Sequence, residues 1–180
     1  ESWGRAPRVV ELCAGSGAVS LALATEWPGL QQWAVERSSD ALPYLRRNLA
    51  ETAVTVVAGD MATALDCLDS RVDVVVANPP YVPEATWAEL PADVRDADPK
   101  EALVAGPDGL DAIKVVAAVA ARLLRPGGVV ACEHDDTHGV TAPAIFRAAG
   151  FTDVADHQDL AGRPRFVTAS QRPSAAPPGP

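Results

Sequence analysis

Short apolar runs alternate with longer alanine- and leucine-rich stretches along most of the chain. The short runs are rich in valine, which favours extended backbone, and they predict strands at Arg8–Leu12, Gln32–Val35, Val54–Val57, Val72–Ala77 and Gly128–Glu133. The longer stretches predict helices at Ala18–Glu26, Ser39–Glu51, Gly109–Leu124 and Thr141–Ala149. Alternation of this kind is typical of an α/β fold with a mostly parallel sheet.

Two more strand-like segments follow, near Phe151–Asp156 and Arg165–Ala169, and we expect them to pair antiparallel at the end of the sheet. Residues 1–170 are therefore predicted to form one domain with a single core. Residues 171–180 are rich in proline and alanine and are predicted to be a disordered tail. Because a strand-like run starts almost at once, we expect the chain to be a fragment that lacks an N-terminal part.

The ends of the elements carry local signals. Ser39 and Asp40 are candidate caps for the second helix, and residues 125–128 (Arg-Pro-Gly-Gly) predict a turn between the third helix and the next strand. The stretch from Pro83 to Pro107 contains four prolines and predicts a long irregular loop. A loop of that length inside a compact domain is usually functional.

Charge and cysteine content narrow the class of function. The formal charge of −9 argues against a nucleic-acid substrate, since such proteins usually present a basic patch. Three scattered cysteines without a CxxC pair argue against disulfides and structural zinc, and favour a cytoplasmic setting. No apolar run approaches the roughly 18–20 residues that cross a bilayer. His134 and His138 are four residues apart but follow a strand, so we predict no metal site.

The first strand runs into a turn of small residues, Cys13 to Gly17, that opens a helix. Glycines there let the backbone pass close to a ligand at the carboxyl end of the strand. The turn keeps Gly15 and Gly17 but lacks the third glycine of a dinucleotide fingerprint, and Glu11 would repel a pyrophosphate. A cofactor with a cationic sulfonium and an ammonium group tolerates that carboxylate better, which favours S-adenosylmethionine over NAD.

Two more carboxylates follow the next two strands. Glu36 can accept hydrogen bonds from both ribose hydroxyls of a nucleoside cofactor, and its alternative is a solvated surface residue. Asp60, which precedes Met61, can accept from an adenine amino group or cap the next helix. These residues extend the predicted cofactor site along the edge of the sheet.

The fourth strand runs into Asn78-Pro79-Pro80-Tyr81, the most specific motif of the chain. An amide nitrogen is a poor nucleophile because its lone pair is delocalised, so a catalyst must hold and aim the NH2 group. Asn78 can supply a side-chain oxygen and Pro79 a backbone carbonyl as acceptors, while Tyr81 can stack on a flat amide or base. The alternatives are a loop that merely ends a strand, or a non-catalytic nucleotide-binding module.

With these motifs the chain resembles the HemK/PrmC family of release factor glutamine N5-methyltransferases, over roughly Arg8 to Ala169. The motifs that carry the resemblance are the 11–17 turn, the Asn78–Tyr81 motif, Asp98–Leu103, Gly106–Asp111, Leu124–Gly128, Glu133-His134 and Asp159–Arg163. The resemblance implies a Rossmann-like class I S-adenosylmethionine-dependent methyltransferase fold, with a seven-stranded, mostly parallel sheet and a C-terminal antiparallel strand. It implies N5-methylation of the glutamine in the Gly-Gly-Gln loop of a peptide chain release factor.

Site roles are carried over by position. The resemblance implies cofactor contacts at Glu11, Cys13, Gly15, Gly17, Glu36, Asp60, Met61 and Asn78, and an amide-binding catalytic set of Asn78, Pro79 and Tyr81. Cys13 stands where the family often has glycine, and we interpret its thiol as a packing group. The Asn-Pro-Pro-Tyr motif is shared with DNA adenine and ribosomal RNA guanine methyltransferases, so N-methylation of a base is the alternative. The family also has an N-terminal helical domain and an arginine-containing substrate loop, which this sequence does not include.

Overall fold

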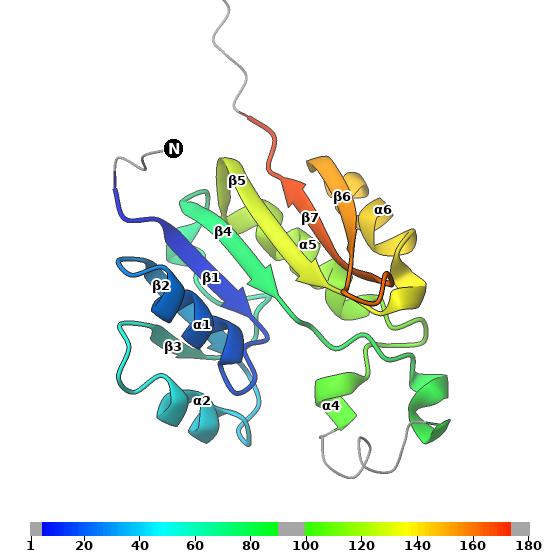
Figure 1. Ribbon diagram of the computed structural model, residues 1–180, viewed down its shortest axis with the longest axis horizontal. Helices are drawn as coiled ribbons and strands as arrows, with labels where there is room; N and C mark the ends of the chain where they lie inside the picture. Colours follow the sequence, from blue (N-terminus) through cyan, green and yellow to red (C-terminus); the bar gives the residue numbers. More distant parts are fainter. Residues whose placement is uncertain (1–4, 90–99, 174–180) are drawn as a thin grey trace, which may run out of the picture.

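A computed structural model describes residues 5–89 and 100–173. A seven-stranded sheet runs through it in the order β3-β2-β1-β4-β5-β7-β6 (Figure 1). The strands are β1 (Arg8–Leu12), β2 (Gln31–Glu36), β3 (Thr55–Ala58), β4 (Val72–Ala77), β5 (Leu124–Glu133), β6 (Thr152–Gln158) and β7 (Pro164–Ser170). Every pairing is parallel except those of β7, which runs antiparallel to β5 and β6. The predicted sheet and its antiparallel strand are confirmed.

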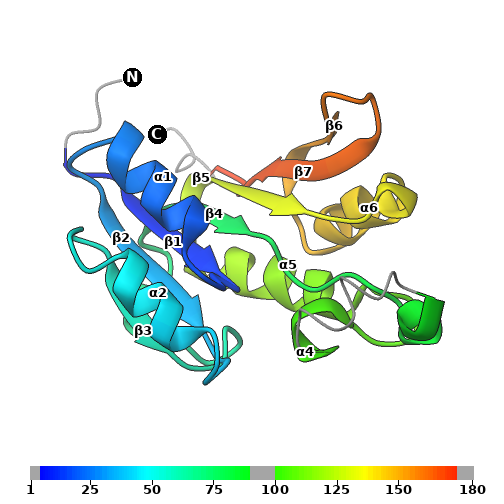
Figure 2. The same cartoon turned by 60° about the horizontal axis from the view of Figure 1, so that its bottom comes forward.

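Each half of the sheet is covered by helices on a different face. α1 (Ala18–Glu26) and α2 (Leu42–Asn48) lie on one face, and α5 (Asp111–Leu123) and α6 (Thr141–Ala148) lie on the other (Figures 1 and 2). Right-handed crossovers explain this division, because the chain moves outward from β1 in one direction and from β4 in the other. The remaining short helices are η1 (Asp66–Leu68), η2 (Glu84–Glu89), α4 (Lys100–Leu103) and η3 (Asp136–His138).

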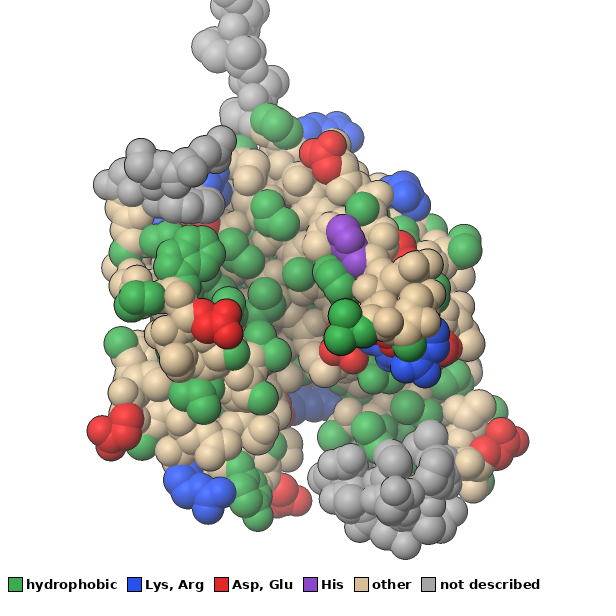
Figure 3. Space-filling model, in the orientation of Figure 1, with side chains coloured by type: hydrophobic (Ala, Val, Ile, Leu, Met, Phe, Trp, Pro, Cys, Tyr) green, Lys and Arg blue, Asp and Glu red, His purple; other side chains and the backbone are tan. Residues whose placement is uncertain are grey.

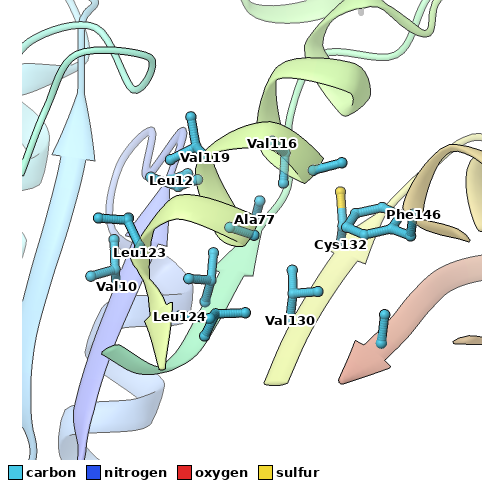
Figure 4. Close-up of a cluster of buried hydrophobic side chains, with 14 of the residues drawn as sticks. Val10, Leu12, Ala77, Val116, Val119, Leu123, Leu124, Val130, Cys132 and Phe146 are labelled. Atoms are coloured by element: carbon cyan, nitrogen blue, oxygen red, sulfur yellow. The ribbon is translucent and has the colours of Figure 1, made fainter. Parts of the chain in front are cut away.

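The main core lies between the sheet and α5 and α6 (Figure 4). The buried residues of α5 recur at helical spacing, and they are Ile113, Val116, Ala117, Val119, Ala120 and Leu123. They pack on side chains of the central strands, including Val10, Leu12, Val75 and Val130, each with at most 1% of its surface exposed. This packing fixes the register of β1, β4 and β5 and therefore the positions of the residues at their carboxyl ends.

The predicted caps of α2 are wrong. The helix begins at Leu42 rather than at Ser39, its N-cap is Ala41, and no side chain caps it. Pro43 stands in the first turn, where its missing N–H costs nothing. The Ser38 hydroxyl accepts the Ala41 N–H at 3.2 Å, so the polar contact comes from the residue before the predicted pair.

The predicted turn at residues 125–128 is part of β5. Val72 pairs with Leu124 and Val74 with Val129, so the intervening residues of β5 form a bulge within the strand. The backbone of this bulge contacts the residue that follows β7, because the Gly127 N–H donates to the Gln171 carbonyl at 3.0 Å. Gln171, expected to start the tail, is thus hydrogen-bonded to β5. The rest of the predicted tail, from residue 174 onward, lies outside the described residues.

A buried carboxylate links three strands at the amino end of the sheet. Asp73 has no exposed surface, and it accepts hydrogen bonds from the Arg8 backbone at 2.7 Å and from the guanidinium groups of Arg5 at 2.8 Å and Arg125 at 2.5 Å. Burial alone would raise the pKa of this carboxyl. The hydrogen bonds and the two cations outweigh burial and hold the pKa below its ordinary value.

Asp73→Ala should lower the free energy of unfolding by about 1–3 kcal/mol, because the Arg8 N–H loses its acceptor while the two arginines that lose their partner are partly exposed. Since the native pKa is lowered, the contribution of Asp73 is present above the unfolded pKa of about 4 and is lost as the pH falls below it. Urea unfolding at pH 7 and pH 3 measures both effects. Asp40→Ala, at an exposed aspartate, is the control. Equal losses in the two variants would contradict the proposed role of Asp73.

Candidate functional site

The predicted site residues meet at one edge of the sheet. The carboxyl ends of β1 to β4 border a cleft of about 1320 Å³. Its lining includes most of the predicted cofactor contacts, namely Glu11, Cys13, Gly15, Glu36, Asp60, Met61 and Asn78. Gly17, Pro79 and Tyr81 do not line it. This edge is where open α/β sheets bind their ligands.

The turn after β1 adopts left-handed backbone at alternate residues. Cys13, Gly15 and Gly17 have φ values of 56°, 55° and 86°. A β-carbon on Gly15 would meet nothing within 4 Å, whereas one on Gly17 would lie 2.6 Å from Leu45. Gly15 therefore leaves open space in the cleft for a ligand, while Gly17 allows close packing of the turn on α2.

Cys13 is a non-glycine residue in this strained conformation. Its Sγ atom lies 3.5 Å from Sδ of Met61, across the cleft floor. Burial and the surrounding carboxylates raise the pKa of the thiol to about 12. The thiol is therefore neutral at physiological pH, which agrees with a packing group rather than a nucleophile.

Glu11 is a buried acid at the end of β1, with 3% of its surface exposed. Ser20 of α1 donates its backbone N–H to Oε2 at 2.9 Å and its hydroxyl to the same oxygen. Burial raises the pKa of Glu11 to about 7, although the bonds from Ser20 oppose the rise. A cation in the adjacent cleft would favour the ionised form and so lower this pKa.

Glu36 is buried, with 8% of its surface exposed, so it is not the solvated residue of the alternative interpretation. Its carboxylate accepts the backbone N–H groups of Gly15 and Ser38, each at 2.7 Å. These bonds tie the turn after β1 to the end of β2. A carboxylate has about four acceptor positions, so lone pairs remain for ligand hydroxyls.

Asp60 is exposed at the rim of the cleft. One carboxylate oxygen accepts the Ala62 N–H at 2.8 Å, which stabilises a turn rather than an α-helix. The predicted cap is therefore a turn contact. The other oxygen receives no hydrogen bond from the described residues, in keeping with a place for a ligand donor.

The Asn78–Tyr81 motif continues directly from β4. Asn78 is exposed to the cleft, Pro79 is buried and Tyr81 is half-buried. Burial, and then the nearby Glu133 carboxylate, raise the pKa of the Tyr81 hydroxyl. Two backbone hydrogen bonds fix the chain just after the motif. The Val82 N–H donates to the Leu103 carbonyl at 2.8 Å, and the Ala105 N–H donates to the Val82 carbonyl at 2.9 Å.

The predicted long loop therefore contains structure that supports the motif. η2 and α4 lie within the loop. Just after the loop, Gly109 packs so closely against Tyr81 that a β-carbon on Gly109 would be 2.2 Å from the Tyr81 carbonyl oxygen. Of the Asp98–Leu103 motif, Asp98 and Pro99 lie outside the described residues. The loop thus contributes to the site by fixing the backbone at Tyr81.

Glu133 belongs to a motif of the resemblance, but no site role was predicted for it. It ends β5 and borders a second, smaller cavity of about 190 Å³ beside the cleft. Glu11 and Asn78 line both cavities. Its position at the end of a parallel strand, at the same edge as Glu11 and Asn78, is the signal that could have identified it.

His134 and His138 lie outside the cleft and have separate hydrogen-bond partners. The ring of His134 is buried between the Asp135 carbonyl and Oδ1 of Asp156, each 2.8 Å from a ring nitrogen. His138 contacts the Asp108 carbonyl at 3.1 Å. Among residues 5–89 and 100–173 no three potential metal ligands are grouped, and no helix is long and apolar enough to cross a membrane.

Known methyltransferases are similar in sequence to this chain. Residues 3–91 match the family model of the methyltransferase small domain. The release factor glutamine methyltransferases of Streptomyces coelicolor and Mycolicibacterium smegmatis are each 51% identical to this chain over 91% of its length. The chain is thus similar, over nine-tenths of its length, to release factor glutamine methyltransferases. It spans 58% of the length of each of these two relatives.

Solved structures share the fold of this chain. A methyltransferase from Pyrococcus furiosus covers 94% of the chain with a TM-score of 0.66 at 19% identity, and the chain covers 78% of that structure. Similarity at this identity reports the fold alone. The fold is that of the class I S-adenosylmethionine-dependent methyltransferases.

The two glycines of the turn should respond differently to alanine. Gly15→Ala should cost about 1–2 kcal/mol of stability, because the residue is left-handed, and should weaken S-adenosylmethionine binding at least ten-fold by filling the cleft. Gly17→Ala should cost about 1–3 kcal/mol more stability than Gly15→Ala, because its methyl group would also collide with Leu45. Thermal unfolding and calorimetric titration measure the two effects. The reverse order of stability would contradict this assignment.

The raised pKa of Glu11 predicts a pH-dependent stability and affinity. A native carboxyl that holds its proton more tightly than the unfolded chain stabilises most below pH about 4.5, and this contribution falls as the pH rises to about 7. A cationic cofactor binds the ionised form, so affinity for S-adenosylmethionine should rise up to about ten-fold per pH unit below pH 7.

Calorimetry from pH 5.5 to 7.5 in buffers of different ionisation enthalpy checks this release of a proton. Glu11→Gln should bind weakly and without the pH slope, while Glu51→Gln, at an exposed glutamate, should keep it. A flat wild-type profile would exclude the coupling.

Proposed function

We propose that this chain binds S-adenosylmethionine in the cleft and methylates N5 of the glutamine in the Gly-Gly-Gln loop of a peptide chain release factor. The observation that carries the proposal is the meeting of Glu11, Glu36 and Asp60 with Asn78 around one cleft. Acidic groups at the ends of three strands suit a cationic nucleoside and do not suit a pyrophosphate.

The residues present fit the cofactor. The open space at Gly15 gives room for a ligand close to the backbone, and the turn from Cys13 to Gly17 shapes that wall. Glu11 would face the cationic groups, Glu36 would accept from ribose hydroxyls, and Asp60 with Met61 would border the adenine. S-adenosylmethionine supplies the methyl group. The protein supplies fixed acceptors and a pocket of matching charge.

The acceptor amide would lie at Asn78. Its side-chain oxygen and the Pro79 carbonyl can each accept one hydrogen of the NH2 group, which aims the nitrogen lone pair into the cleft. The ring of Tyr81 would pack on the flat amide, and the Leu103–Gly109 segment fixes the backbone beneath it. Holding both partners in line can contribute several kcal/mol to the rate. The amide nitrogen loses its proton after transfer, so no general base is needed first.

Relatives support the acceptor. The names of the most similar relatives state release factor glutamine as their substrate, and these relatives are longer than this chain. We therefore assign residues 1–170 as the methyltransferase domain, a release factor as its partner and the cytoplasm as its location. Gln171 is hydrogen-bonded to β5, so only residues 172–180 remain a predicted tail.

A small arylamine is a second candidate acceptor. The chain is 42% identical over 145 residues to a 4-amino-L-phenylalanine/4-methylamino-L-phenylalanine methyltransferase of Streptomyces pristinaespiralis, and it spans 49% of that relative. Paired acceptors over an aromatic ring would suit an arylamine nitrogen as well as an amide. A nucleic-acid base is disfavoured by the net charge of −9.

Asn78→Ala should reduce methyl transfer to a release factor by about 100-fold or more, because the acceptor nitrogen is no longer aimed. Affinity for S-adenosylmethionine should change much less. Transfer of a labelled methyl group to the purified factor measures the first, and calorimetry measures the second. Gln158→Ala is the control, since Gln158 is an exposed amide side chain on β6 and does not line the cleft.

The acceptor is identified by substrates offered in parallel. Label should appear on the intact factor and not on a factor whose Gly-Gly-Gln glutamine is alanine. Label on 4-amino-L-phenylalanine alone would support the arylamine candidate, and label on a DNA duplex would support the base. Label on none of them, with cofactor bound, would refute the proposal for this chain.

A further inference from the structure

The smaller cavity lies on the sheet face that carries α1. It is bordered by α1, β1, β4, β5 and β7, and it opens beside Asn78. Figure 3 shows this face, where hydrophobic side chains remain visible over β4 and β5 between α1 and β7. Its volume of about 190 Å³ is far more than the roughly 10–15 Å³ that one water requires. The cavity is therefore large enough for an amino-acid side chain.

Two carboxylates face this cavity. Glu11 is more than nine-tenths buried, and both hydrogen bonds from Ser20 go to Oε2, so Oε1 has no donor among the described residues. Glu133 is half-buried at the end of β5. No Lys or Arg nitrogen of the described chain lies within 4.0 Å of either carboxylate, and Arg165, which does interact with Glu133, pairs with Asp159 at 3.4 Å. Two carboxylates in a shared cavity repel one another, and Glu133 has only Arg165, beyond 4.0 Å, and the Tyr81 hydroxyl as favourable partners among the described residues, so a cation that joins the two carboxylates would be bound favourably.

The proposed cofactor does not supply this cation at Glu133. Glu11 lines both cavities and can face the cofactor, whereas Glu133 lines the small cavity and not the cleft. A ligand cation that binds Glu133 would therefore enter from the acceptor side.

The walls define the kind of cation. Val76, Ala131 and Phe166 line the cavity with apolar surface, which suits a cation on a long apolar stem. Phe166 is held in place because its ring stacks on His157, with centroids 4.7 Å apart. An aromatic wall favours a guanidinium or an ammonium group.

We infer that this cavity is a subsite for an arginine or lysine side chain of the acceptor polypeptide, near in sequence to the methylated residue. This inference rests on the proposed function, since Asn78 lines both cavities and a chain that places its amide there runs past the smaller one. Glu133 is then a specificity-determining residue, which prefers acceptors that carry a cation beside the methylated nitrogen.

N-acetyl-arginine amide is the probe, and its neutral citrulline analogue is the matched control. Nuclear magnetic resonance titration of the labelled chain should show saturable shifts at Ala131, Glu133 and Phe166 with arginine, and at least ten-fold weaker binding of citrulline. Glu133→Gln should weaken arginine binding at least five-fold, and Glu51→Gln should leave it unchanged. Equal binding of the two probes, or shifts confined to other residues, would overturn the subsite. If Glu133→Gln does not fold, the two probes on the wild-type chain still decide.

Methyl transfer separates this inference from the proposed function. Two glutamine peptides that differ only by arginine or citrulline beside the glutamine should differ at least five-fold in KM, and Glu133→Gln should abolish the difference. Methylation that ignores this substitution, with no binding of the arginine probe, would overturn the subsite and leave the function standing. Binding of the arginine probe, with no methylation of any glutamine acceptor, would refute the proposed function and support the subsite.

Discussion

Parallel pairing of β1 with β2 on one side and with β4 on the other brings the ends of these strands to one edge of the sheet. The strands are buried within the sheet, so polar side chains can gather only where the strands stop. Glu11, Glu36 and Asn78 each lie at such an end. A shift of one residue in this pairing would turn a carboxylate into the core, which is why the packing of α5 on the central strands matters for the site.

The site is assembled from bonds between neighbouring strand ends. Glu36 of β2 accepts the Gly15 N–H, so a carboxylate of one strand shapes the turn that follows another. Ser20 of α1 binds Glu11 in the same way. On the acceptor side, the Leu103–Gly109 segment holds the backbone at Tyr81 and Val82. Cofactor wall and acceptor wall are therefore built by different segments and meet at Asn78.

The two ends of the sheet treat buried carboxylates differently. At the amino end, Asp73 is surrounded by Arg5, Arg125 and the Arg8 N–H, and its pKa is lowered. At the carboxyl end, Ser20 is the only described residue that donates to Glu11, and burial raises the pKa of Glu11 to about 7. A carboxylate that is already paired with cations stabilises the fold. One that is buried without a cation is poised to receive one from a ligand, and this contrast links stability to function.

Local sequence was enough to determine the elements and the motifs. Valine runs predicted the positions of the buried strands along the chain, because burial on both faces favours apolar residues. The Gly15–Gly17 turn predicted the cofactor edge, because left-handed backbone favours glycine. Pairing across the chain decided the rest. Residues 125–128 became a bulge because β4 and Gln171 lie beside them, and Ser38 rather than Ser39 contacts the start of α2. The sequence placed Glu133 at the end of a strand, but only the pairing of β5 with β4 decided that this end borders the same cavity as Asn78.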